Sequence, residues 1–77
     1  MEDFINEIES LGFVKEVFYY KTDNDENDKD IWVKDNFALY FDWTLKRWFY
    51  SCYSELNYSE GLPYDNVVTT DFMANYR

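Results

Sequence analysis

The chain has 77 residues, of which 16 are acidic and 7 are basic, so its formal net charge at neutral pH is −9. A chain of this length forms one domain and buries only about 60% of the surface that its unfolded form exposes, which leaves a thin margin of stability. The single cysteine, Cys52, excludes an internal disulfide, and the lack of histidine leaves too few ligands for a zinc site. What remains to build a core or a partner interface is a high content of Phe, Tyr and Trp, at 23% of the residues.

The acidity limits which partners the chain can bind directly. A negative field repels phosphate backbones, so direct binding to nucleic acid or to an anionic membrane is disfavoured. The same field attracts basic surfaces, including protein clefts that bind nucleic acid, although solubility alone explains the charge equally well. No segment approaches the ~18 apolar residues of a membrane span, and the acidic start 1–4 lacks the basic region of a secretory signal. A cytoplasmic location is expected.

A short helix is predicted over residues 3–11. Three apolar residues share one helical face at i, i+4 and i+7: Phe4, Ile8 and Leu11. Gly12 follows as a residue that readily takes the left-handed conformation at a helix end, and Phe13 is placed to pack back on Ile8.

Residues 14–22 are β-branched and aromatic and predict a strand, after which the chain changes character. Residues 23–30 contain five acids and no apolar residue, so they are predicted to form a solvated hairpin loop. The loop resembles the start of a calcium-binding loop, but Asp28 stands where the turn needs glycine and Lys34 where a bidentate glutamate belongs. No calcium site is therefore expected.

The strongest strand pattern is a hairpin of residues 37–42 and 47–53 joined by four residues. Setting Asp42 opposite Arg47 fixes the register. One face then carries Phe41 with Trp48, Leu39 with Tyr50, and Phe37 with Cys52. The other face carries an opposite-charge pair, Asp42 with Arg47, followed by Tyr40 with Phe49 and Ala38 with Ser51.

The remaining segments complete the predicted fold. Residues 54–64 are read as a loop, 67–69 as a short edge strand, and Thr70 as the cap of a last helical turn. Three residues of that turn are expected to touch the core: Phe72, Met73 and Tyr76. We predict a single α+β domain over residues 1–77, with an antiparallel three- to four-stranded sheet, an N-terminal helix and a short C-terminal helical turn.

The chain lacks the residues that catalysis usually needs. Without histidine there is no common general base or metal ligand, and no Ser-His or Cys-His arrangement can form. Two glycines are too few for a glycine-rich phosphate loop. No enzymatic activity, cofactor or metal is therefore expected.

A partner-binding surface is predicted instead. If one face of the sheet stays open, Tyr40 and Phe49 form an exposed aromatic pair, and such patches on small proteins mark contacts. The competing reading is that the C-terminal segment, through Phe72 and Met73, covers that face. With the acidic loop, the predicted binding residues are Asp23, Asp25, Glu26, Asp28, Asp30, Tyr40 and Phe49.

These features favour a small acidic inhibitor that occupies a basic, nucleic-acid-handling surface of a partner protein. In composition alone, the chain is similar to the small acidic inhibitors that phages and mobile elements encode, some of which mimic DNA. Two alternatives remain: a cognate immunity protein or antitoxin that neutralises a basic toxin, and an oligomerising structural subunit. Charge-driven binding weakens with ionic strength, whereas aromatic self-association does not.

Overall fold

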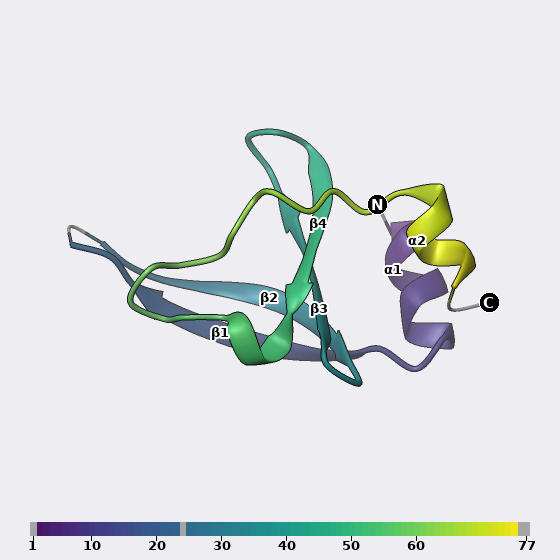
Figure 1. The fold of residues 1–77 in the computed structure, drawn as a ribbon, viewed down its shortest axis with the longest axis horizontal. Coiled ribbons are helices and arrows are strands. Elements are labelled where there is room, and N and C mark those ends of the chain that lie inside the picture. Colours follow the sequence, from purple (N-terminus) through teal and green to yellow (C-terminus); the bar gives the residue numbers. More distant parts are fainter. Residues whose placement is uncertain (1, 24, 76–77) are drawn as a thin grey trace.

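The computed structural model describes residues 2–23 and 25–75. Its elements are α1 (Glu2–Ser10), β1 (Val14–Lys21), β2 (Glu26–Lys34), β3 (Phe37–Asp42), β4 (Arg47–Cys52), the 3-10 turn η1 (Tyr53–Glu55) and α2 (Thr70–Ala74). The four strands form one antiparallel sheet in the order β1-β2-β3-β4. The predicted α+β class, with an N-terminal helix and a short C-terminal helix, is confirmed (Figure 1).

Helix α1 ends as the sequence predicts. Gly12 has a φ of 105°, in the left-handed region. Its N–H donates to the carbonyl of Glu9 at 3.1 Å, and the N–H of Phe13 donates to the carbonyl of Ile8 at 3.0 Å. These two bonds close the helix as a Schellman motif, and Ile8 and Phe13 then meet in the same apolar cluster.

The predicted β3–β4 register is confirmed at every position, from Phe37 opposite Cys52 to Asp42 opposite Arg47. The expected charge pair at its end is replaced by a turn contact. The carboxylate of Asp42 accepts the N–H of Leu45 at 2.7 Å, and Asp42 makes no ion pair with Arg47. A backbone N–H of the turn thus provides a hydrogen bond to the carboxylate of Asp42, which is almost fully buried.

Apolar clusters cover both faces of the sheet. On the face beneath α1 the buried residues are Ile8, Phe13, Trp32, Leu39 and Met73. On the opposite face they are Ile31, Ala38, Tyr40, Phe49 and Leu62. The core is therefore divided by the sheet into two layers.

The expectation of an open sheet face is wrong. Tyr40 is 0% exposed and Phe49 is 2% exposed, because the segment that follows β4 crosses over them. Leu62 packs against the pair, and the carbonyl of Pro63 accepts a hydrogen bond from the Tyr40 hydroxyl. That bond satisfies the one polar group that the burial of Tyr40 would otherwise leave unpaired.

The C-terminal segment covers the α1 side of the sheet and not the Tyr40 side. Phe72 stacks on Tyr50 with ring centroids 4.2 Å apart, and Met73 is buried beside α1. The N-cap of α2 is Thr69 rather than the predicted Thr70, and its hydroxyl accepts the N–H of Phe72 at 3.2 Å.

Two further predictions for this segment have different outcomes. The predicted edge strand 67–69 is reduced to a single bridge between Val67 and Phe49. Tyr76 lies outside the described residues.

The β1–β2 hairpin extends well beyond the rest of the sheet. β1 and β2 pair through eight positions, whereas β2 pairs with β3 through only three, from Trp32 to Lys34. Residues 16–23 and 25–31, which we call the arm, therefore project away from both helices (Figure 1). The predicted loop over 23–30 was too long, because residues 26–30 belong to β2. Backbone pairing with β1 holds them as a strand without any apolar side chain.

Residues 57–61 contact the arm at Tyr20 and Lys21. The carbonyl of Tyr58 accepts the N–H of Lys21 at 2.5 Å. Gly61 has a φ of 86°, and a Cβ there would lie 3.3 Å from the ring of Tyr20. A glycine at this position lets the supporting segment turn close against the arm.

No helix within the described residues is long and apolar enough to cross a membrane.

Substitution of the covered face tests this architecture. Phe49→Ala should lower the free energy of unfolding by about 3–5 kcal/mol, because it opens a cavity between the sheet and Leu62. Tyr58→Ala, which truncates a ring that is 65% exposed, should change it by less than about 0.5 kcal/mol. Urea denaturation followed by tryptophan fluorescence measures both. Equal stability of the two variants would contradict the packed face.

Candidate partner-binding surface

Three of the predicted acids form a row on the arm. Glu26, Asp28 and Asp30 alternate along β2, so they point to the same face, about 7 Å apart from one to the next. All three are exposed. On the same face of β1 lie Val17 and Tyr19, which are 65% and 52% exposed. This face of the arm therefore presents the row of carboxylates beside exposed apolar side chains.

The three carboxylates differ in their neighbours. Glu26 pairs with Lys21 and Asp30 pairs with Lys15, each at 3.5 Å and each between half-exposed or more exposed side chains. Asp28 faces Tyr19 across the strands and makes no ion pair with any residue that the structure describes. A hydrogen bond from the Tyr19 hydroxyl to Glu26 raises the pKa of Tyr19. Asp28, the middle carboxylate, is thus the one of the three without an ion pair to a described residue.

The other predicted binding residues lie in two separate places. Asp23 and Asp25 are exposed near the tip of the arm, next to the acidic row in the sequence. Tyr40 and Phe49 are buried on the far face of β3 and β4, so they cannot contact a partner without unfolding their cover. The acids are brought together on the arm, and the aromatic pair belongs to the core.

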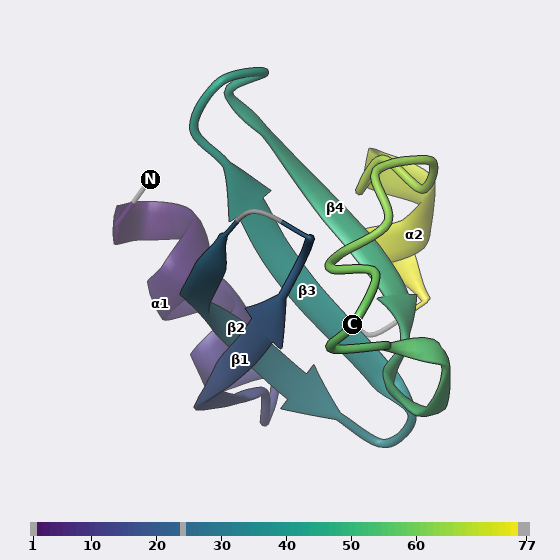
Figure 2. The same ribbon diagram turned by 90° about the vertical axis from the view of Figure 1, so that its left-hand side faces the viewer.

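A groove separates the arm from the β3–β4 turn. Its volume is about 380 Å³. Asp28 and Asp30 of β2 line one side, and Phe41 and Trp43 line the other. The remaining lining residues are Val17, Tyr20, Lys29 and Trp32. Figure 2, which views the molecule from the arm's end, shows β2 leaving the sheet beside β3.

Trp43 is the most exposed aromatic residue of the groove, with 65% of its surface accessible. Its ring meets Phe41 edge to face with centroids 4.9 Å apart. Phe41 in turn contacts Trp48 at 5.5 Å, and Trp48 contacts Trp32 at 5.3 Å. Through this series, the exposed ring is anchored on the core beneath α1.

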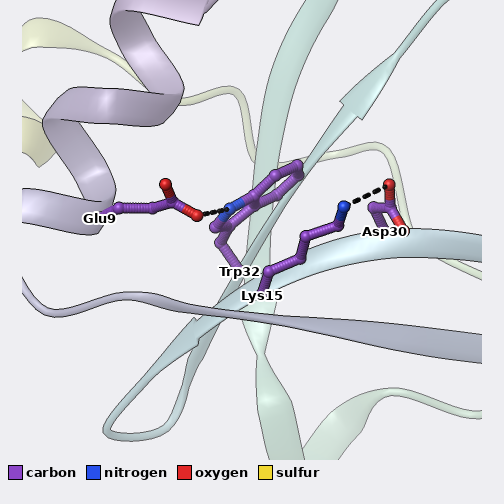
Figure 3. A network of polar contacts seen from close by, with 4 residues as sticks. All are labelled: Glu9, Lys15, Asp30 and Trp32. Atoms are coloured by element: carbon purple, nitrogen blue, oxygen red, sulfur yellow. Dashed lines mark hydrogen bonds and ion pairs between the residues drawn. The ribbon is translucent and has the colours of Figure 1, made fainter.

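Trp32 lies on the face of the sheet that α1 covers, and it is held there by a hydrogen bond to α1 and by a ring contact with Trp48. Its indole N–H donates to the Glu9 carboxylate of α1 at 3.2 Å. Figure 3 shows the ring between Glu9 and the Lys15–Asp30 pair. Trp32 is only 5% exposed, so it closes the inner end of the groove and not its mouth.

Sequence reasoning missed Trp43, Val17 and Tyr19 as surface residues. The signal for Trp43 was present, because a tryptophan in a four-residue hairpin turn stands where polar residues prevail. Val17 and Tyr19 gave no such signal, since the imperfect alternation of their strand left the buried face undetermined.

The described residues include no metal-binding cluster, and no known relative gives information on function. Within residues 2–23 and 25–75, no three Cys, Asp or Glu side chains gather closely enough to hold a metal ion. Comparison with protein-family models, with curated proteins and with solved structures finds no match.

The buried state of Tyr40 predicts a loss of stability at alkaline pH. Burial, followed by the nearby charge of Asp65, raises the pKa of Tyr40 above its ordinary value of about 10. The folded protein therefore keeps a proton that the unfolded chain releases above that pH. Stability should be full below about pH 10 and should fall as the pH rises further.

The urea midpoint measured at about pH 9 and about pH 11 checks this expectation. Tyr40→Phe should be about 1 kcal/mol less stable than the wild type at about pH 9, from the missing bond to Pro63, and its stability should fall much less between the two pH values. An equally steep fall in Tyr40→Phe would assign the effect to other groups.

Proposed function

We propose that this protein acts by binding, without turnover, as a small acidic inhibitor that occupies a basic, nucleic-acid-handling surface of a partner protein. The observation that carries the proposal is the exposed carboxylate row on a projecting arm. From residue 21 to residue 30 the chain has five acids and two lysines, and this stretch belongs to the arm, which projects away from both helices (Figure 1).

The geometry suits attraction of a cationic surface. The acids lie on a strand pair with a fixed backbone, so their spacing is set before binding and little backbone entropy is lost. Exposed carboxylates each add little to the final affinity, on the order of 0–1 kcal/mol. They act chiefly on the association rate, through a field that salt screens over about 10 Å at 0.1 M.

Capture from a lysate of the source cells at low salt, followed by mass spectrometry, identifies the partner. The proposal expects a protein with a basic surface that handles nucleic acid, and expects that nucleic acid to compete with this chain for the same surface. A partner with an acidic surface, or one whose nucleic acid binds undisturbed, would contradict it.

The arm itself is tested by neutralising its row. The triple variant Glu26→Gln, Asp28→Asn, Asp30→Asn should associate with the captured partner more slowly, by about tenfold at low salt, and nearly at the wild-type rate at high salt. Surface plasmon resonance at two ionic strengths measures the rates.

A matched control removes the same charge from the other end of the molecule. Glu2, Asp3 and Asp71 lie on α1 and α2, far from the arm (Figure 1). Their neutralisation should slow association much less than that of the arm row. Equal slowing by the two triple variants would show that only net charge matters and that the arm has no special role.

A further inference from the structure

We infer that the groove between the arm and the β3–β4 turn binds a single arginine side chain of the partner. This inference rests on the proposed function and makes it more specific: the acidic row attracts the basic surface, and the groove fixes one residue of it. The two sides of the groove supply different interactions, and arginine is the side chain that uses both.

One side of the groove is aromatic and the other is anionic. Phe41 and Trp43 offer ring surfaces, while Asp28 and Asp30 offer carboxylates. A guanidinium group is planar, stacks on aromatic faces and presents a fork of donors that matches a carboxylate. A lysine ammonium is a strongly hydrated point charge and gains less from a ring wall. The volume of about 380 Å³ lies near the lower end of the range for ligand sites, about 300–1,000 Å³, and suits one long side chain.

The carboxylates are available to such a guest. Asp28 has no ion pair with any described residue. Asp30 is held by Lys15 at 3.5 Å, but both side chains are about half exposed, and pairs of this kind contribute little. An entering guanidinium can therefore replace Lys15 at small cost.

The lining also contains one cation, Lys29, which opposes a positive guest. It lies between Asp28 and Asp30 in the strand, so its side chain leaves the sheet on the opposite face. The groove thus keeps a net negative charge, and Lys29 provides a substitution that should strengthen binding.

The aromatic wall is fixed before binding. Trp43 rests on Phe41, and Phe41 rests on Trp48 of the core, so little side-chain freedom is lost when a guest stacks on it. A cation stacked on an exposed ring gains enough to change affinity by about two- to fivefold.

The experiment titrates ¹⁵N-labelled protein with three pentapeptides at low salt. They are identical apart from the central residue, which is arginine, lysine or citrulline, the neutral analogue of arginine, with glycines on both sides. The arginine peptide should shift the indole resonance of Trp43 and the amide resonances of Asp28 and Asp30. The lysine peptide should bind several-fold more weakly, and the citrulline peptide should leave these resonances unchanged.

Matched variants separate the groove from the general field. Asp28→Asn with Asp30→Asn should weaken the arginine peptide by about fivefold, whereas Asp23→Asn with Asp25→Asn, which removes the same charge at the tip, should have a much smaller effect. Trp43→Ala should weaken it by about two- to fivefold, whereas Leu45→Ala, an exposed neighbour in the same turn, should not. Lys29→Gln should tighten it by about twofold.

Three results would overturn the inference. Equal loss in the two acidic double variants would show a diffuse field only, and equal binding of the citrulline peptide would show a merely apolar groove. Concentration-dependent shifts of Trp43 without any peptide would make a second copy of this chain the occupant. If these results appear while the captured basic partner still depends on the arm row, the groove assignment fails and the proposed function stands. If the partner does not depend on the row either, both fail.

Discussion

The short pairing between β2 and β3 governs the rest of this architecture. The two strands share only three residue pairs before they separate, whereas β1 follows β2 for eight. Before Trp32 in the sequence, β2 pairs only with β1, so this part of the hairpin is not joined to β3. An isolated two-stranded hairpin is only marginally stable in water. The supporting segment meets that need, through the bond from Lys21 to Tyr58 and the close approach of Gly61 to Tyr20.

The same segment explains how so small a chain obtains a sufficient core. After residues 57–61 leave the arm, the chain crosses β3 and β4, buries Tyr40 and Phe49 under Leu62 and turns a two-layer fold into one with apolar packing on both faces. The Tyr40 hydroxyl accompanies the ring into the interior, where an unpaired hydroxyl would cost about 1–3 kcal/mol. The carbonyl of Pro63 prevents that loss. Support of the arm and closure of the core thus come from one segment.

The elements that could be predicted from the sequence are those whose cause is local. The end of α1 at Gly12 needs only one residue in the left-handed conformation. The β3–β4 register needs only the alternation of side chains along the two strands and the pairing of Asp42 with Arg47. The cover of Tyr40 could not be predicted, because the segment around Leu62 has no periodicity and meets β3 only through contacts distant in sequence. The strand at residues 26–30 was missed for a related reason: polar composition indicates exposure, and exposure does not exclude pairing with a neighbouring strand.

The carboxylates of the arm are also suited to a structural use, the protection of a strand edge. Among the described strands, none lies beside the edge of β2 from Glu26 to Ile31, and charges on such an edge discourage the addition of a foreign strand. Charged side chains of either sign protect an exposed strand edge from pairing with another chain, and apolar side chains beside them weaken that protection. Here the row has Val17 and Tyr19 beside it, and Trp43 across the groove, all more than half exposed. Protection of the edge does not need these three exposed side chains, whereas the proposed binding of a cationic side chain would use the carboxylates and the rings together.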